Sequence, residues 1–457
     1  MKIYFVLLMT LLAAVGARAQ DFTALEKTVG DELREKNATG AAVAIIKDGK
    51  VVFAKGFGDA NAETGAPVTT DTLFQVGSIT KTFTAAMILE LAEEGKLKLD
   101  APVGDYAKNL SPRLSKIKFA QLLSHTGGII DEADEFGASD ESLMATYIRS
   151  WKDDYALFEA GEVFSYSNSG YALAGFAAQE AAGKSYIDLM TEKIFSPLGM
   201  KSATFRPTVA MTYPLAVGHQ AKPGEKPTVV RPLPQDARLY PAGTFYASLN
   251  DLTRFALAFL DGGRLNGKPI IPAAVIEKMS MPRAAQLSAN DDTHYGYGLF
   301  MNTSGGGKQL WHDGSMTGYV AQIKFIPDQK IAVIILGNTN NVVLSKTQEK
   351  ALELSAKAKS AEVIKPKGAL AMTAAEMQNY VGTYDQPNRW KIEVILKENR
   401  LFIKELGQEL PLTKIGENRF ALQFPQAPRP IEIYIQPAAN GKSGFVQQYV
   451  WAFKKIL

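Results

Sequence analysis

The sequence predicts an α+β protein: an antiparallel sheet flanked by helices, with a helical lobe beside it, followed by a small all-β barrel. Two β-rich stretches, residues 41–58 and 308–337, are separated by a long region of helical patches and polar loops. We expect the two stretches to form one sheet and the region between them to form the lobe. Short alternating segments with turn residues between them fill residues 373–457, which is typical of a barrel or sandwich.

The composition is that of a globular protein with more than one domain. The chain has 457 residues, of which 46% are hydrophobic and 21% charged, an ordinary balance for a packed core. A net charge of +3, spread along the chain, argues against a nucleic-acid partner. The chain has no cysteine, so disulfides, a thiol nucleophile and a lipid-modified cysteine are all excluded.

The N-terminus, "MKIYFVLLMTLLAAVGARAQ", has the pattern of a secretory signal peptide. Lys2 precedes an apolar run, Ile3–Val15, and Ala17 and Ala19 form an A-x-A cleavage pattern. The run is shorter than the roughly 20 residues that a membrane span needs. We therefore predict cleavage after Ala19, a periplasmic or secreted protein, and no membrane contact after cleavage.

The first domain is predicted from its elements in order. Helical spacing of apolar residues covers Phe22–Leu33, and Asp48-Gly49 is a strong hairpin signal between two β-rich runs. "SITKTFTAAMILELAEEGK" then reads as a buried helix that stops at Gly95. Two strands joined at Asp328-Gln329 and a helix over 342–361 complete the domain.

The C-terminal domain begins after a linker. "TAAEMQNYVGTY" opens with a capping box from Thr373 to Glu376. Six alternating segments follow: "KIEVIL", "RLFIKE", "ELPLTKI", "NRFALQF", "IEIYIQ" and "FVQQYVWAF", with turns at Glu398-Asn399, Gly416-Glu417 and Asn440-Gly441. The predicted boundaries are a signal peptide at 1–19, the first domain at 20–362, a linker at 363–372 and the barrel at 373–457.

Ser78 and Lys81 stand three residues apart at the start of the helix in "QVGSITKTFTAA". Positions i and i+3 share a helix face, so the amine can approach the hydroxyl. The helix N-terminus favours developing negative charge, and burial lowers the pKa of a lysine. The pair predicts an activated nucleophile, although S-x-x-K alone is also the pattern of a capping serine beside a surface lysine.

A second segment, "GEVFSYSNSGYALAG", places Tyr166 and Asn168 two residues apart in a loop before a helix. In extended backbone such residues point the same way, so a phenol and an amide can face one cleft. The tyrosine would shuttle a proton, and the amide would hold Lys81 or a substrate carbonyl. The simpler alternative is an aromatic and polar loop without chemistry.

A third segment, "LWHDGSMTGYVAQIKF", places His312, Asp313 and Gly314 at the start of a predicted strand. Glycine permits a close backbone approach to a ligand. The N–H groups of Ser315 and Ser78 would together form an oxyanion hole. The alternative is a hairpin turn rich in small residues.

In this order, S-I-T-K, Y-S-N and H-D-G resemble the motif set of the serine β-lactamase and penicillin-binding protein superfamily. The tyrosine in the second motif resembles class C β-lactamases, D-peptidases and related esterases. "LLSHTGG", "PAGTFYASLNDLTRF" and "YGYGLF" also fit, and the resemblance covers Phe22–Ala361. The C-terminal domain is similar to the lipocalin-like modules attached to some D-peptidase relatives. Its role is left open: it would cover the cleft, mediate homo-oligomers or bind an apolar ligand. The alternative is a barrel that is filled by its own side chains and serves only for packing.

The resemblance implies the fold predicted above, with the site between sheet and lobe, and a role for each matching residue. These are Ser78 as the acylated nucleophile, Lys81 and Tyr166 as shared base and acid, Asn168 as the group that orients Lys81 and the substrate, His312 and Gly314 along the substrate-binding strand, and the N–H groups of Ser78 and Ser315 as the oxyanion hole.

Three departures from the family pattern bear on the substrate. His312 stands where β-lactamases carry lysine, and a neutral histidine lacks the fixed charge that would pair with a penicillin carboxylate. Asp313 adds a negative charge, although its side chain is expected to point away from that of its neighbour on the strand. Ala160-Gly161 replaces the usual Pro-Gly before the second motif. The first two departures favour ester or peptide substrates over β-lactams.

The expected function is that of an exported serine hydrolase that forms an acyl-enzyme at Ser78. The substrates would be small molecules or peptides: D-amino-acid peptides or short acyl esters. A non-catalytic binder or sensor and a true class C-type β-lactamase are the alternatives. No cofactor is implied, and no H-E-x-x-H or clustered ligand spacing predicts a metal. We expect His125 to cap a helix or hydrogen-bond locally, and the acidic run 131–141 to be a solvated loop over the cleft mouth.

Overall fold

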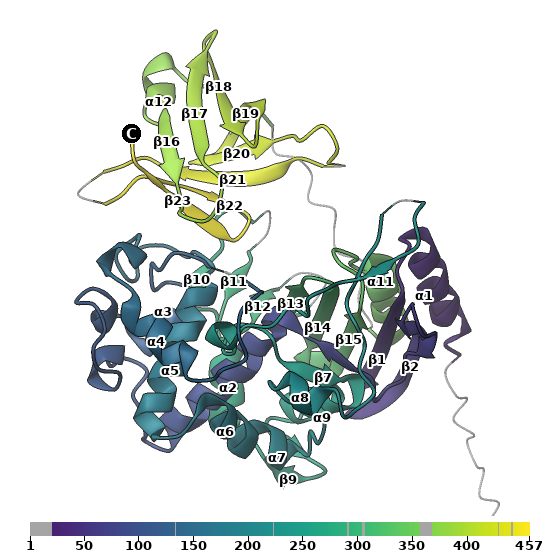
Figure 1. Cartoon of the computed structure of the whole chain (residues 1–457). Coiled ribbons are helices and arrows are strands. Elements are labelled where there is room, and N and C mark those ends of the chain that lie inside the picture. The colour runs from purple at the N-terminus through teal and green to yellow at the C-terminus, as the bar shows by residue number, and fades with distance from the viewer. Residues whose placement is uncertain are drawn as a thin grey trace, which may run out of the picture.

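The computed structural model describes residues 21–132, 134–222, 224–289, 292–303, 307–356, 368–427, 429–439 and 442–457. The predicted signal peptide, the first half of the predicted linker and the predicted Asn440-Gly441 turn lie outside the described residues. A larger α+β part lies below a smaller barrel in Figure 1.

One antiparallel sheet organises the larger part, as predicted. The pairing of β1 with β15, with Val43 opposite Ile335, joins the early and the late β-rich stretches. Asp48 and Gly49 form the turn between β1 and β2 with φ values of +51° and +73°, the left-handed conformation that such hairpins need. The strand order is β10 (Ala284–Ala285), β11 (His294–Tyr295), β12 (Phe300–Asn302), β13 (Gln309–Met316), β14 (Tyr319–Ile326), β15 (Ile331–Gly337), β1 (Gly40–Lys47), β2 (Lys50–Asn61) and β3 (Ala66–Pro67).

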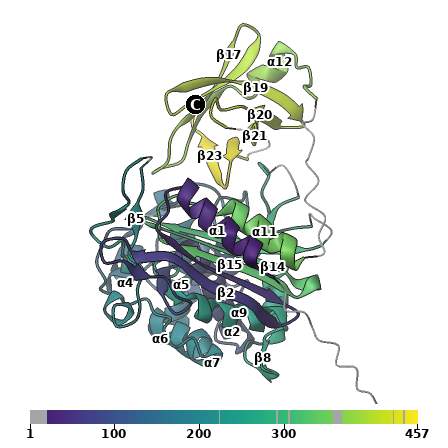
Figure 2. The ribbon, with the colours of Figure 1, turned by 90° about the vertical axis from the view of Figure 1, so that its right-hand side faces the viewer.

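Helices cover both faces of this sheet. Alternate residues of β1 point to opposite faces, so Val43 packs under α1 (Thr23–Glu35) and α11 (Ser345–Ser355), which lie side by side in Figure 2. The neighbouring Ala44 belongs to the main core, against which α9 (Leu249–Leu260) packs on β1 and β15. The predicted terminal helices are confirmed; the later one runs over Ser345–Ser355, and residues 357–361 of its expected range lie outside the described residues.

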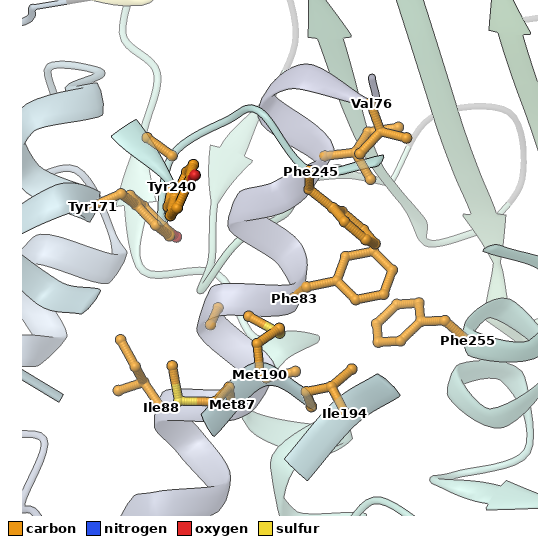
Figure 3. Close-up of a cluster of buried hydrophobic side chains, with 14 of the residues drawn as sticks. Val76, Phe83, Met87, Ile88, Tyr171, Met190, Ile194, Tyr240, Phe245 and Phe255 are labelled. Carbon is orange, nitrogen blue, oxygen red and sulfur yellow. The ribbon is translucent and has the colours of Figure 1, made fainter. Parts of the chain in front are cut away.

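The helix α2 (Thr80–Glu93) runs through the middle of the larger part. Residues 80–89 are all buried, because α5 (Asn168–Ala182), α6 (Tyr186–Met190) and α10 (Ala273–Met279) pack against the helix. Figure 3 shows Phe83, Met87 and Ile88 projecting from it into the core. A helix that is buried on nearly every side holds the residues at its N-terminus in fixed positions.

Apart from the 15-residue helix α5, the helical lobe and its borders are built from short elements. They are α3 (Phe119–Leu123), α4 (Leu143–Ser150), α5 (Asn168–Ala182), α6 (Tyr186–Met190), α7 (Ser196–Leu198), α8 (Pro207–Ala210) and α10 (Ala273–Met279), with the two-stranded pairs β4 (Leu73–Gln75) with β7 (Tyr246–Ser248), β5 (His219–Gln220) with β6 (Thr228–Val229), and β8 (Arg264–Leu265) with β9 (Lys268–Pro269).

The C-terminal part is a closed eight-stranded barrel, which confirms the predicted all-β fold. The predicted capping box is present at Thr373 and Glu376. Apolar side chains such as Ile403 and Phe420 are fully buried inside the barrel. Its elements are α12 (Ala374–Gln378), β16 (Gly382–Asp385), β17 (Ile392–Lys397), β18 (Arg400–Glu405), β19 (Gln408–Gly416), β20 (Arg419–Leu422), β21 (Ile431–Gln436), β22 (Phe445–Gln448) and β23 (Trp451–Lys455).

The last predicted strand is two strands in the structure. "FVQQYVWAF" turns back on itself between β22 and β23, with Tyr449 in the left-handed region at φ +53°. The turn contains no glycine, asparagine or aspartate, so the sequence carries none of the usual turn signals. This β22–β23 turn points toward the larger part of the molecule.

Candidate active site

The predicted nucleophile lies in a short 3₁₀ turn, Gly77–Ile79, that leads directly into α2. Ser78 is only half-buried, whereas Lys81, one turn further on, is completely buried. The Lys81 Nζ lies 3.0 Å from the Ser78 Oγ, as the i and i+3 spacing predicted. The structure therefore brings the amine and the hydroxyl into direct contact, while Ser78 keeps part of its surface exposed.

Two further oxygens hold the amine in place. The Lys81 Nζ donates to the Asn168 Oδ1 at 2.6 Å and to the Ala242 carbonyl at 2.7 Å. Burial lowers the pKa of Lys81 from 10.5 to about 7, even though the charge of Asp131 raises it in part. Neutral and charged amine are thus both populated near pH 7, which is what a proton acceptor needs.

The second motif approaches this amine from the lobe. Ser167 is the N-cap of α5, and its side chain accepts from the Gly170 N–H, so the chain is extended just before the helix. Asn168 begins the helix, and the ring centre of Tyr166 lies 4.8 Å from the Lys81 Nζ. Residues two apart in the sequence therefore do face one centre.

The Tyr166 hydroxyl is a neutral phenol at rest. Burial raises its pKa well above the usual value, and an interaction with the Ser78 side chain offsets only part of that rise. A phenol of this kind can donate or pass on a proton but cannot serve as the resting base near pH 7. This leaves Lys81 as the group in contact with Ser78 that can accept the first proton.

The third motif lies on β13, backbone against backbone with the nucleophile turn. A Cβ on Gly314 would lie 1.9 Å from the Val76 carbonyl oxygen, and one on Gly77 would lie 2.6 Å from the Ser315 N. Only glycine permits an approach this close. The N–H groups of Ser78 and Ser315 are thereby brought to neighbouring positions, as an oxyanion hole requires.

His312 lies beneath the site. It is 1% exposed, and its Nε2 lies 3.1 Å from the Tyr295 hydroxyl, while its Nδ1 lies 2.7 Å from the Asp313 carbonyl. Burial and the Lys81 charge lower the pKa of His312 to about 3, so the ring is neutral. The exposed Asp313 alternates with it along β13, as expected for neighbours on a strand. The centres of the His312 and Tyr166 rings lie 6.3 Å apart. Direct contact between His312 and a substrate stays a prediction.

The expectation of a solvated acidic loop is wrong for its first residue. Asp131 is 1% exposed, and its Oδ1 accepts from the Asn168 N–H at 2.8 Å and from the Asn168 side-chain amide at 2.9 Å. Its position after the apolar "GGII" is the only local hint of burial. His125 is also part of the site, since its ring packs 4.2 Å from that of Tyr166 and its Nδ1 accepts from the Ser167 N–H.

Neither a metal cluster nor a membrane-crossing helix is found in the described ranges. No group of three or more histidine, aspartate or glutamate side chains there could hold a metal ion. The helices of that same part of the chain are too short or too polar to cross a bilayer.

Comparison with known proteins identifies the class. The Beta-lactamase family matches residues 25–358, so the chain belongs to this family. It is 29% identical over 319 residues to "Penicillin-binding protein 4" of Amycolatopsis lactamdurans; the aligned region covers 67% of this chain and 83% of that protein. It is 25% identical over 333 residues to "Protein flp" of Staphylococcus aureus, covering 71% of this chain and 64% of that protein.

Two solved structures resemble nearly the whole chain. That of SurE, which has also been solved with D-Leu, matches with a TM-score of 0.78 and 25% identity over 95% of this chain and 98% of its own. The octameric penicillin-binding protein homologue from Pyrococcus abyssi matches with a TM-score of 0.67 and 24% identity over 95% of this chain and 100% of its own. The likeness therefore extends beyond the family match into the C-terminal barrel.

Proposed function

We propose that this protein is a serine hydrolase that forms an acyl-enzyme at Ser78 and cleaves amide or ester bonds in D-amino-acid peptides or short acyl esters. The observation that carries the proposal is the buried Lys81 amine, 3.0 Å from the Ser78 Oγ, with a pKa lowered to about 7. A lysine confined in this way serves as a proton acceptor, whereas a capping serine needs no such neighbour.

Acylation follows from the contacts at the centre. The neutral Lys81 amine takes the Ser78 proton as the Oγ attacks the substrate carbonyl, and the N–H groups of Ser78 and Ser315 stabilise the oxyanion. The Tyr166 phenol, which interacts with the Ser78 side chain, then relays the proton from Lys81 to the departing nitrogen or oxygen. The leaving group departs and the acyl group remains on Ser78.

Deacylation uses the same groups in reverse. Water attacks the acyl carbonyl and gives up a proton through Tyr166 to Lys81, the oxyanion returns to the same two N–H groups, and the Ser78 Oγ leaves and is reprotonated. Asn168 keeps Lys81 in place through both steps, because its Oδ1 accepts a hydrogen bond from the amine at 2.6 Å.

The third motif supports the choice of substrates. The ring of His312 is neutral and buried, so it supplies no fixed positive charge for the carboxylate of a β-lactam. Asp313, the next residue of β13, is exposed and supplies no positive charge either. We therefore propose that β-lactam turnover is weak or absent, although acylation by a β-lactam, as the name of the 29%-identical penicillin-binding protein suggests, is compatible with the site.

Covalent labelling tests the proposal. A fluorophosphonate or a fluorescent penicillin should add one label per wild-type chain and none to Ser78→Ala, with intact mass as the readout. Absence of label on the wild type would favour the non-catalytic binder. Faster turnover of nitrocefin than of p-nitrophenyl butyrate or D-alanyl peptides would favour the class C-type β-lactamase.

We also propose that the chain is exported through the N-terminal signal and works in the periplasm or outside the cell. The pattern from Lys2 to Ala19 supports this proposal. Intact mass of the protein recovered from an expressing bacterium should show a chain that begins at Gln20. An uncleaved chain in the cytosolic fraction would contradict it.

A further inference from the structure

The β22–β23 turn of the barrel lies against the segment that carries the catalytic tyrosine. The Tyr166 N–H donates to the Val450 carbonyl at 2.8 Å. On either side, the Ala452 N–H donates to the Ser165 Oγ at 3.1 Å, and the Gln447 side chain donates to the Phe164 carbonyl at 2.7 Å. The backbone of the second motif is therefore held by the C-terminal domain.

A second group of contacts reaches the buried Asp131. Its Oδ2 accepts from the Trp451 Nε1–H at 2.9 Å and forms an ion pair with the Arg389 guanidinium. Arg389 lies between β16 and β17, and its guanidinium stacks over the Trp451 ring, 4.3 Å from the ring centre. Both barrel residues thus bind the same carboxylate oxygen, while the other oxygen faces Asn168.

We propose that Arg389 and Trp451 are positioning residues of the active site: by binding Asp131 they fix the Asn168 amide and the charge that faces Lys81. The orientation of the amide follows from the hydrogen bonds. Because the Asn168 Nδ2 donates to Asp131, its Oδ1 must point the other way, toward the Lys81 Nζ. The proposal rests on the proposed function, since it assigns the barrel a part in that same centre.

The charge of Arg389 matters as well as its geometry. Asp131 carries a buried negative charge that raises the pKa of Lys81, and the guanidinium of Arg389 compensates that charge. Without Arg389 the uncompensated carboxylate favours the charged amine, and less neutral Lys81 is present near pH 7. The other titratable groups that face Lys81 are Tyr166, Tyr171, His125 and His312. Glu132, the next residue after Asp131, accepts hydrogen bonds from the side chains of Tyr147, Tyr155 and Asn388.

The test is the pH profile of Ser78 labelling by a fluorophosphonate, measured on the full chain. Arg389→Met should move the midpoint of the rise in labelling rate upward by about one pH unit, while the rate at high pH recovers toward the wild type. Arg389→Lys keeps a cation, so its midpoint should lie closer to that of the wild type than the midpoint of Arg389→Met does. In an Asp131→Asn background, Arg389→Met should cause no further upward movement, because the charge it compensates is gone.

A matched control and a second variant separate positioning from folding. Arg400→Met removes an exposed arginine of the same barrel and should leave the profile unchanged. Trp451→Phe keeps an aromatic ring, removes the Nε1–H donor and should lower the labelling rate while circular dichroism stays that of the wild type.

The outcomes distinguish the two proposals. A wild-type chain that takes no label overturns the proposed function, and this inference falls with it. A labelled wild type whose midpoint is the same in Arg389→Met, or an Arg389→Met variant that loses rate equally at every pH, overturns the inference alone.

Discussion

Lys81→Met should change how the stability of the protein depends on pH. The pKa of Lys81 falls from 10.5 to about 7 on burial, a difference of about 3.5 that corresponds to roughly 5 kcal/mol at 1.36 kcal/mol for each pKa unit. In the unfolded chain the amine keeps its proton up to its ordinary pKa, whereas in the folded chain it releases the proton near pH 7. The unfolded state therefore binds more protons between these two values, and the free energy of unfolding of the wild type rises with pH across that window.

The variant lacks this contribution. The difference in free energy of unfolding, wild type minus Lys81→Met, should be smallest below pH 7 and should increase by several kcal/mol, with roughly 5 kcal/mol as the upper bound, as the pH approaches 10.5. Denaturant unfolding at a series of pH values measures it. Lys108→Met removes an exposed lysine of the same part of the molecule and controls for the loss of a lysine as such.

A difference curve that stays flat across this window would refute the reasoning. It would mean that the buried amine keeps its ordinary affinity for a proton, so that Lys81 is fully charged near pH 7. The amine would then be unable to take the Ser78 proton, whatever the distance between them.

Two further variants test the rest of the site. Tyr166→Phe keeps the ring beside Lys81 but removes the hydroxyl that relays the proton, so hydrolysis of p-nitrophenyl butyrate should fall by roughly 10²–10³-fold with little change in thermal unfolding; unchanged turnover would exclude the relay. Gly314→Ala places a Cβ 1.9 Å from the Val76 carbonyl oxygen. It should lower the free energy of unfolding by about 1–3 kcal/mol and slow the labelling of Ser78. The control Gly416→Ala, where a Cβ has room, should change neither the stability nor the labelling rate. Labelling of Gly314→Ala at the wild-type rate would show that the close approach of β13 is not needed.

Local sequence signals predicted the parts of the fold that depend on local geometry. Asp48-Gly49 marks a hairpin because the turn itself requires left-handed residues, and the structure has that turn. Ser78 and Lys81 meet because three residues of helix place them on one face. These predictions needed no knowledge of distant contacts.

The residues that sequence reasoning missed depend on contacts between distant segments. Asp131 reads as part of an acidic surface run. Its contacts with Asn168, with Trp451 and with Arg389, which lies 258 positions further along the chain, make burial of its charge tolerable. Tyr449 breaks the expected last strand without a turn residue, at the place where the barrel meets the second motif. The turn-residue rule fails at Tyr449 because this segment contributes contacts to the site. Strained turns next to active sites are common in folded proteins.

Catalysis as proposed requires a neutral amine beside Ser78. The decisive measurement is the rate at which a fluorophosphonate labels wild-type Ser78, followed by intact mass across a range of pH. We predict a rate that rises with pH to a plateau, with its midpoint near the lowered Lys81 pKa of about 7. A rate that does not change with pH, or one that continues to rise toward the ordinary lysine pKa of 10.5, would contradict it.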